Sequence, residues 1–223
     1  MLNRYLVASI IILSAFIIIS LFITPKINPS INLSSSSINK ADLSAFLYIN
    51  NAHYKPINQF MIYLSLYGRE VFWIVTIVLL FTLGGRTGKK TALILSLTII
   101  ALIPIGIIAK QTIERPRPII PANDFLIPAD TEFSFPSGHA LIVSAGATIA
   151  LALFRDSTKK LVISLILTLE AALVCISRVY VGGHYPLDVI GGIILGVGIS
   201  CIFLWKAKEI ESVFQKIAAR IRR

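Results

Sequence analysis

The sequence has 223 residues, of which 56% are hydrophobic and 14% charged, and its mean hydropathy is +0.81. These values exclude an ordinary soluble globular domain, in which about a quarter of the residues are charged. The formal net charge is +10, but the basic residues gather in alternate connections between apolar segments. This distribution favours a role in membrane orientation over nucleic-acid binding.

Six segments are apolar enough, and nearly or fully long enough, to cross a bilayer, which takes about 20 residues. They lie at residues 5–24, 57–83, 91–109, 139–154, 161–177 and 188–205. We therefore expect an all-α fold with one domain, residues 1–223, built as a bundle of six transmembrane helices. The first segment follows Arg4 and ends without a small-residue cleavage site, which favours a retained anchor over a signal peptide.

The basic residues predict the orientation of this bundle. They occur before the first segment, between the second and third, between the fourth and fifth, and in the tail at residues 206–223. The positive-inside rule then places both termini in the cytoplasm of a multi-pass cell-membrane protein. Apolar residues recur at helical spacing in the basic tail, which fits either an interfacial helix on anionic lipid or a solvated helix end.

The outer segment between the first two spans, residues 25–56, contains the serine run 34–37 and a short helical pattern from Ala41 to Asn50. We expect a loop with one surface helix, which acts as a lid or a tether, and a solvated side chain at His53. The second span is interrupted by Gly68, Arg69 and Glu70. Because charges inside a membrane are costly, we expect this helix to be broken near Gly68.

Polar residues collect in two outer connections, residues 110–138 and 178–187. Three clusters stand out: Lys110 to Pro118 with Arg115 and Arg117, Pro136 to His139 with Ser137 and Gly138, and Ser177 to Asp188 with Arg178 and His184. The chain crosses the membrane twice between His139 and His184. The three clusters therefore share one face.

The shared face suits a phosphate group. Lys110, Arg115, Arg117 and Arg178 supply cations, and guanidinium forks can each donate two hydrogen bonds to phosphoryl oxygens without help from a metal. The helix that begins after Ser137 and Gly138 adds free N–H groups and a favourable dipole.

Two histidines and one carboxylate add reactive groups to this face. His184 and Asp188 are four residues apart, so in a helical turn the carboxylate can accept the Nδ1 proton and leave Nε2 free to attack phosphorus. His139 can then protonate the leaving group and later activate water. Taken singly, each residue has a plainer explanation: interfacial cations, or helix caps at Ser137 and Asp188. Those explanations do not predict that all three clusters share a face.

The clusters resemble the three-part signature of the type 2 phosphatidic acid phosphatase superfamily, Lys-x6-Arg-Pro, Pro-Ser-Gly-His and Ser-Arg-x5-His-x3-Asp. Every signature position is present, and the helix pattern extends the resemblance over most of the chain.

The resemblance implies a membrane enzyme without metal or other cofactor, with its active site at the outer membrane–water interface. His184 would form a phosphohistidine, Asp188 would orient it, and His139 would be the general acid. The phosphate-binding residues would be Lys110, Arg117, Arg178, Ser137 and Gly138. Arg115 lies outside the signature, and we expect a secondary phosphate or headgroup contact there. Glu170, about 10 Å deeper on the helix of Ser177, would support Arg178 or a polar residue of the bundle.

The expected activity is hydrolysis of a lipid phosphate or diphosphate of polyprenyl, phosphatidate or phosphatidylglycerophosphate type. The motifs report only the phosphoryl end, so the lipid stays open, with a polyprenyl diphosphate slightly favoured. The alternatives are a lipid phosphotransferase and a non-enzymatic lipid transporter or flippase. A transporter is expected to carry polar residues along the depth of several helices, whereas the charges here concentrate at one rim.

Overall fold

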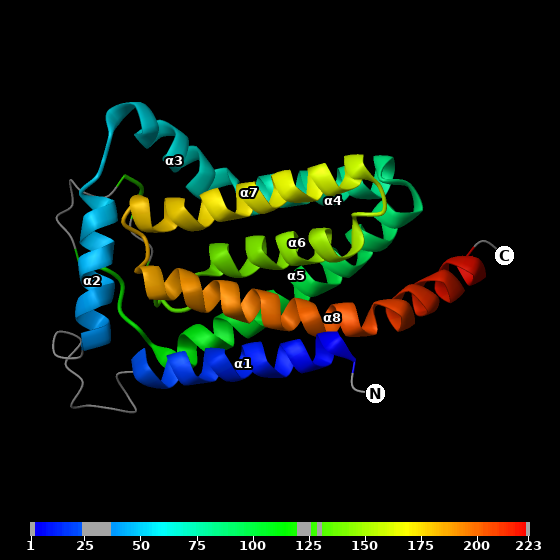
Figure 1. Ribbon diagram of the computed structural model, residues 1–223, viewed down its shortest axis with the longest axis horizontal. Helices are drawn as coiled ribbons and strands as arrows, with labels where there is room; N and C mark the ends of the chain where they lie inside the picture. Colours follow the sequence, from blue (N-terminus) through cyan, green and yellow to red (C-terminus); the bar gives the residue numbers. More distant parts are fainter. Residues whose placement is uncertain (1–2, 24–36, 120–125, 129–130, 222–223) are drawn as a thin grey trace.

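The computed structural model describes residues 3–23, 37–119, 126–128 and 131–221, without the side chains of Ala218 and Ile221. Helices are the regular elements of these ranges, which confirms the all-α expectation (Figure 1). They are α1 (Arg4–Ile23), α2 (Ser37–Asn50), α3 (Lys55–Tyr67), α4 (Glu70–Leu83), α5 (Gly85–Ile113), α6 (Gly138–Leu153), α7 (Thr158–Tyr180) and α8 (Pro186–Ile221).

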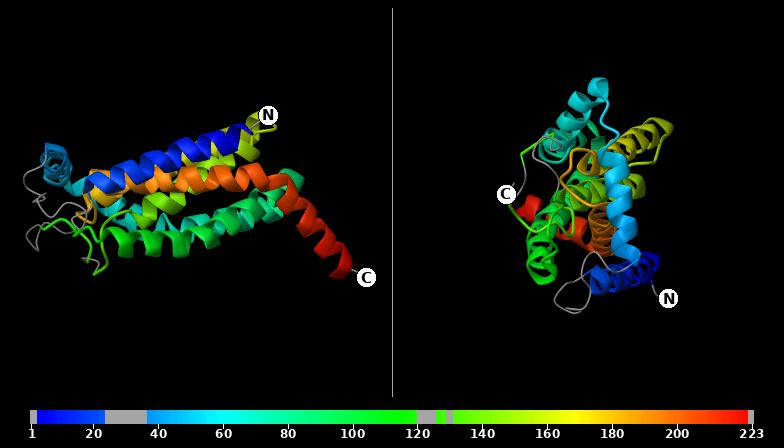
Figure 2. Two further views of the ribbon diagram at one scale, coloured as in Figure 1. Left: turned by 90° about the horizontal axis from the view of Figure 1, so that it is seen from below. Right: turned by 90° about the vertical axis from the view of Figure 1, so that its left-hand side faces the viewer.

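Most of these helices run along the long axis of a bundle, and several are long enough to cross a membrane (Figures 1 and 2). Among the described residues, α1, α5, α7 and α8 each meet the length and hydropathy of a span. The pair α3 and α4 makes a fifth span if it is counted as one, and α6 is a shorter apolar helix of 16 residues. The count of six spans stays a prediction.

The predicted break in the second span is confirmed. Helices α3 and α4 meet at an angle of 63°, with Gly68 and Arg69 between them. A Cβ atom at Gly68 would lie 2.4 Å from Cγ2 of Val174 in α7. The break therefore presses against α7 at a point where only glycine fits.

On the basic side of the bundle, two helices extend beyond the spans that we predicted. The connection expected at residues 84–90 is helical from Gly85, whose positive φ of 64° makes the turn, so Arg86 already lies in α5. The expected tail, residues 206–223, continues α8 as far as Ile221. Residues 199–221 contain no glycine or proline that would end a helix. An ion pair of 2.7 Å between Lys90 and Glu211 ties this extension to α5.

Helix α2 is the predicted surface helix, and it lies across one end of the bundle (Figures 1 and 2). It begins at Ser37, so most of the serine run lies outside the described residues. Its buried residues recur at helical spacing and face the bundle: Asn39, Asp42, Phe46 and Asn50.

His53, just after α2, is not the solvated side chain that we expected. Its Nε2 atom lies 2.8 Å from the backbone oxygen of Tyr180, and the two rings are 4.9 Å apart. The reason is that α2 brings the following loop down onto the end of α7.

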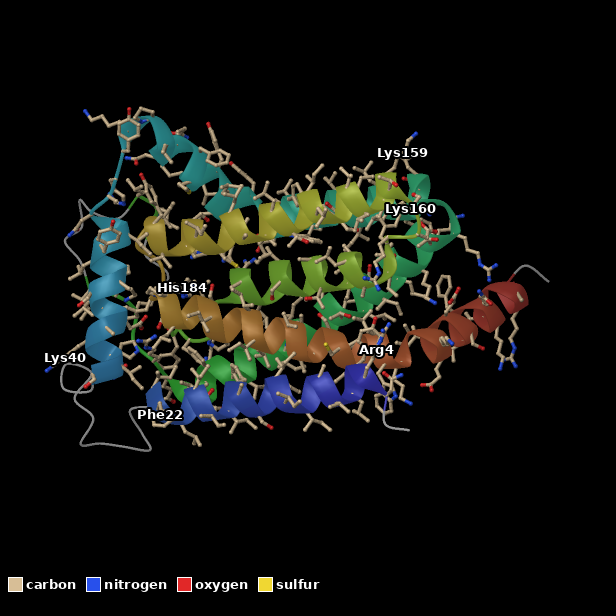
Figure 3. The ribbon with its side chains drawn as sticks, viewed as in Figure 1. Arg4, Phe22, Lys40, Lys159, Lys160 and His184 are labelled. Carbon is tan, nitrogen blue, oxygen red and sulfur yellow. The ribbon has the colours of Figure 1, made fainter. Side chains whose placement is uncertain are left out.

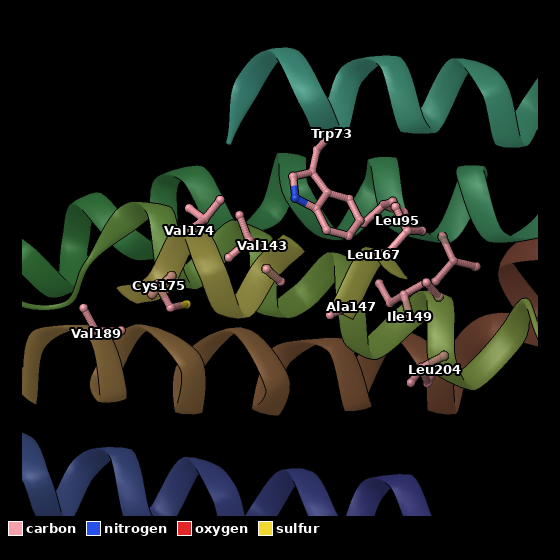
Figure 4. Close-up of a cluster of buried hydrophobic side chains, with 14 of the residues drawn as sticks. Trp73, Leu95, Val143, Ala147, Ile149, Leu167, Val174, Cys175, Val189 and Leu204 are labelled. Carbon is pink, nitrogen blue, oxygen red and sulfur yellow. The ribbon is translucent and has the colours of Figure 1, made fainter. Parts of the chain in front are cut away.

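Close packing between α6 and α8 forms the centre of the bundle. A Cβ atom at Gly192 would lie 2.5 Å from the Ser137 oxygen, and one at Gly196 would lie 2.3 Å from the Leu141 oxygen. Lipid tails are as apolar as leucine, so helices in a membrane associate through such close contacts of small residues. On the other side of α6, the Trp73 ring fills the space beside Gly146 and joins the cluster of buried side chains in Figure 4.

The glycine contact predicts that Gly196→Val lowers the thermal unfolding midpoint in detergent. The added methyl groups would overlap backbone atoms of α6, which costs about 1–3 kcal/mol or more. Ile190→Val, on an exposed position of the same helix, is the matched control and should shift stability by less than about 0.5 kcal/mol. Equal midpoints for the two variants would show that the helices are not in close contact here.

Candidate active site

The three predicted clusters come together at the end of the bundle covered by α2. Lys110 lies in the last turn of α5, Gly138 begins α6, Arg178 lies in the last turn of α7, and α8 begins at Pro186. Figure 3 shows His184 at this end, between α7 and α8. The structure thus brings all of these segments to one place, as the alternation of spans predicted.

Glycines shape the connection that carries His184. The chain leaves α7 through Gly182, whose φ is 89°, a value that favours glycine. The backbone N–H groups of Gly183 and His184 both donate to the Arg178 oxygen at 3.1 Å. A Cβ atom at Gly183 would lie 2.9 Å from Nη2 of Arg178. The guanidinium of Arg178 therefore packs closely against Gly183.

The ring of His184 lies between a carboxylate and a guanidinium. Its Nδ1 atom is 3.5 Å from Oδ2 of Asp188, and its Nε2 atom is 3.3 Å from Nη1 of Arg117. Asp188 also accepts a hydrogen bond of 2.9 Å from the backbone N–H of Tyr185, so it caps α8 as well. The imidazole is therefore turned with Nδ1 toward the carboxylate and Nε2 toward the guanidinium.

Arg117 and Lys110 meet at Glu132. Nζ of Lys110 donates to the Glu132 carboxylate at 2.7 Å, and Nε of Arg117 donates to the Glu132 backbone oxygen at 2.8 Å. The hydrogen bond from Lys110 and its positive charge lower the pKa of Glu132. Nη1 of Arg117 also donates to the Gly183 oxygen at 2.6 Å. Arg117 therefore lies beside His184, and Glu132 links it to Lys110.

Arg178 and Ser137 have definite partners within the protein. Arg178 is 2% exposed, and its Nη1 atom contacts the Ser65 hydroxyl of α3. Ser137 is fully buried, and its hydroxyl accepts from the Ala140 backbone N–H at 3.5 Å, which caps α6. The backbone N–H of Ser137 donates to the backbone oxygen of Asp188 at 2.9 Å. Capping therefore accounts for Ser137, and its part in phosphate binding stays a prediction.

Arg115 is placed differently from our expectation of a headgroup contact. It is 1% exposed, with Nη1 2.6 Å from Oδ1 of Asp188 and Nη2 2.5 Å from Oδ2 of Asp42. Its guanidinium also stacks over the Tyr185 ring at 4.5 Å. Burial disfavours the charge, but Asp188 and Asp42 together hold the pKa of Arg115 above its ordinary value. This placement favours a role in positioning Asp188 over a contact with the lipid.

Asp42 was missed by the sequence reasoning. Besides its ion pair with Arg115, it accepts a hydrogen bond of 2.9 Å from the backbone N–H of Leu187 in the first turn of α8. The available signal was its spacing, because residues 39, 42, 46 and 50 form one helical face. A carboxylate on a buried face needs a cation, and an arginine beyond the signature was there to supply it.

Arg69 was also not assigned to the site. Its Nη1 atom lies 3.4 Å from Nδ1 of His139 and would lie 3.3 Å from a Cβ atom at Gly138. The sequence showed only a charge at a helix break. The bend between α3 and α4 turns that charge toward the beginning of α6.

Glu170 is not beside Arg178. Its carboxylate lies next to the indole of Trp73 and to Gly68, where a Cβ atom would be 3.1 Å from Oε1. The second part of the expectation, support of a polar group in the bundle, fits this position.

A groove of about 470 Å³ opens beside the cations between α4, α5 and α6. Its polar end is formed by Arg69, Lys110, Glu132 and Gly138. Its walls are apolar and run along the helices, with these residues among them: Trp73, Ile74, Ile77, Ile99, Leu102, Ile103, Ile107 and Leu141. The arrangement fits a molecule with an anionic head and a long apolar chain.

Comparisons with known proteins show which family the chain resembles. The model of the PAP2 superfamily matches residues 90–211. The undecaprenyl-diphosphatase of Sulfolobus acidocaldarius is 40% identical over 161 residues, which is 71% of this chain and 75% of that protein. Phosphatidylglycerophosphatase B of Bacillus subtilis is 38% identical over 96 residues, 40% of this chain and 45% of that protein.

A solved structure has the same fold. The crystal structure of a transmembrane PAP2-type phosphatidylglycerolphosphate phosphatase from Bacillus subtilis superposes with a TM-score of 0.70, at 24% identity, over 91% of this chain and 96% of that one. The chain therefore belongs to the PAP2 superfamily, which the motifs predicted. It is a multi-pass membrane protein and a lipid phosphatase.

The buried ion pairs predict that Asp42→Ala impairs the enzyme although Asp42 lies away from the reacting groups. Removing one partner of a buried pair costs about 3–5 kcal/mol when the other is left alone. Because Arg115 keeps Asp188, we expect a loss toward the lower end of that range, measured by thermal unfolding, together with a lower kcat. The control is Asp156→Ala, an exposed carboxylate paired with Lys160, which should cost at most about 1 kcal/mol. Similar losses in the two variants would contradict the network.

Proposed function

We propose that this phosphatase hydrolyses a lipid diphosphate of polyprenyl type, without a metal ion, through a phosphohistidine at His184. The observation that carries the proposal is the orientation of the imidazole. Nδ1 faces Asp188, and Nε2 faces Arg117 beside the polar end of the apolar groove. A nucleophile, a cluster of cations and a channel for a lipid chain therefore adjoin one another.

The choice of lipid is supported by two observations. The relative that is 40% identical over most of both chains is named for undecaprenyl diphosphate. The walls of the groove are lined by isoleucine, leucine and tryptophan side chains along three helices, which suits a single long hydrocarbon chain. Phosphatidate and phosphatidylglycerophosphate are the other substrates to test, since a shorter match covers a phosphatidylglycerophosphatase.

The proposed first step is attack of His184 Nε2 on the terminal phosphorus. A nitrogen–phosphorus bond forms as the bond from phosphorus to the bridging oxygen breaks, and the electron pair of that bond goes to the oxygen. His139 supplies a proton to the leaving lipid phosphate. Arg117, Arg178 and Lys110 stabilise the charge on the equatorial oxygens, which is the main need of phosphoryl transfer. The carboxylate of Asp188 stabilises the imidazolium that forms.

In the second step, water attacks the phosphohistidine. His139, now neutral, takes a proton from the water as the new oxygen–phosphorus bond forms. The nitrogen–phosphorus bond breaks, and its electron pair returns to Nε2 of His184. Orthophosphate leaves, and both histidines regain their starting states.

We expect phosphate release by the purified protein in detergent to persist in EDTA with a polyprenyl diphosphate as substrate. His184→Ala should lower kcat by at least about a thousandfold, as loss of a nucleophile does. His53→Gln, which changes a histidine at the same end that contacts Tyr180 and Asn50, is the control and should stay active. The lipid class is identified by comparing the rates of phosphate release from the diphosphate, phosphatidate and phosphatidylglycerophosphate. The substrate with the highest rate belongs to the preferred class.

Three outcomes would contradict the proposal. Activity that survives His184→Ala removes the phosphohistidine, and activity lost in EDTA removes the metal-free chemistry. If no phosphate is released from one lipid alone but a phosphoryl group passes to a second lipid, the protein is a phosphotransferase.

We also propose that the site faces the outside of the cell and that both termini are cytoplasmic. In support, Arg4, Lys159 and Lys160 lie at the end of the bundle opposite His184 (Figure 3), where the positive-inside rule puts the cytoplasm.

This orientation predicts that a thiol at Lys40→Cys, on α2, reacts with a membrane-impermeant maleimide in intact cells. A thiol at Lys159→Cys, at the opposite end, should react only after the membrane is opened. The native thiols of Cys175 and Cys201 are buried and give little background. The reverse labelling pattern would place the site in the cytoplasm.

A further inference from the structure

The break between α3 and α4 places a cation that the signature does not contain at the edge of the site. Arg69 is about one-third exposed, whereas Arg178 is 2% exposed. On one side its Nε atom pairs with Glu70 at 2.5 Å. On the other side its Nη1 atom lies 3.4 Å from Nδ1 of His139.

The groove begins at this arginine. Its polar end is formed by Arg69 and Lys110 together with Glu70, Glu132 and Gly138, and the apolar walls continue away from them. If a lipid chain lies in the groove, its head group therefore lies beside Arg69. The reacting phosphate lies further on, at His184. The part of the lipid that connects the hydrocarbon chain to the reacting phosphate must therefore lie next to this guanidinium.

We propose that Arg69 binds the second phosphate of a lipid diphosphate, the one that remains on the lipid after hydrolysis. The inference rests on the proposed function, because it takes His184 as nucleophile and His139 as acid. In an in-line displacement the leaving oxygen lies opposite the nucleophile, next to His139. In a diphosphate that oxygen carries the second phosphorus, whose other oxygens then lie beside His139, where Nη1 of Arg69 stands.

Two consequences follow for the reaction. Negative charge develops on the departing phosphate as its bond to the terminal phosphorus breaks, and a guanidinium there stabilises that charge. A lipid monophosphate has carbon at this position and gains nothing from Arg69. The residue therefore raises the preference for diphosphates over monophosphates of the same lipid.

A simpler role for Arg69 is that of an interfacial arginine that extends toward water at a helix break. In that role it would show no discrimination between the two kinds of substrate. The contact with His139 and the closeness to Gly138 favour the first role, because they turn the guanidinium into the site.

The test compares kcat/KM of wild type and Arg69→Gln on a polyprenyl diphosphate and on the monophosphate of the same chain. We expect a fall of about 10- to 100-fold for the diphosphate, in keeping with the loss of a charged hydrogen bond to a transition state. For the monophosphate we expect a fall of less than about threefold. Arg69→Lys keeps the positive charge but loses the paired N–H donors of the guanidinium. Its kcat/KM on the diphosphate should lie between the values of wild type and Arg69→Gln. Lys55→Gln, an exposed cation at the start of α3, is the control for net charge.

Equal losses on both substrates, or no loss on the diphosphate, would overturn the proposal. If Arg69→Gln does not yield folded protein, the ratio of the two kcat/KM values in Arg69→Lys decides. That ratio must fall below the wild-type ratio.

The proposed hydrolysis can be wrong while the proposed role of Arg69 is right, and a binding measurement separates the two. If wild type releases no phosphate, or His184→Ala stays active, the role of Arg69 is judged by binding alone. Stabilisation of wild type by a lipid methylenediphosphonate is then compared with stabilisation by the matching phosphonate in thermal unfolding. Arg69→Gln should weaken only the first, and an equal effect on both would overturn the proposal.

Discussion

The carboxylate of Asp188 is the point at which the reactive loop is joined to the rest of the molecule. It is fully buried, and an uncompensated charge there would cost several kcal/mol. Arg115 supplies the compensation at 2.6 Å, and Asp42 at 2.5 Å balances the second side of the guanidinium. Because these partners come from α2, the connection after α5 and the start of α8, both ion pairs form only when all three elements are docked. The helix across the end of the bundle is therefore part of the site.

A second constraint fixes the distance between the two histidine-bearing helix ends. The backbone N–H of Ser137 donates to the backbone oxygen of Asp188 at 2.9 Å, which ties the beginning of α6 to the beginning of α8. Gly192 and Gly196 then keep the two helices in backbone contact. In a membrane such contacts replace the hydrophobic effect as the source of helix association. The positions of His139 and His184 therefore follow from small residues well away from either ring.

The groove and the cations lie in two different environments. The charged groups stand at one end of the bundle, away from the middle of the apolar helices, where charges cost most. The apolar walls between α4, α5 and α6 continue from that end. The bend of 63° between α3 and α4 belongs to both parts, because it carries Arg69 to the polar end and leaves Trp73 against Gly146 in the core.

Much of this organisation was determined by the sequence itself. Apolar segments of membrane length predicted the helices, and the interruption at Gly68 predicted the break that the structure confirms. Counting the crossings between His139 and His184 predicted that the motifs share one end. The four-residue spacing of His184 and Asp188 predicted their contact. Each of these inferences depends on local periodicity or on the order of spans, which a linear sequence records directly.

Only the tertiary structure decided which charges face the substrate and which hold the protein together. Arg115 and Arg117 are two residues apart and look alike in sequence, yet one is buried between two carboxylates and the other lies beside Nε2 of His184. The partners of Arg115 are each 73 residues away along the chain. Whether an arginine binds a carboxylate or remains open to a ligand depends on which distant side chain packs beside it, and local spacing carries no record of that.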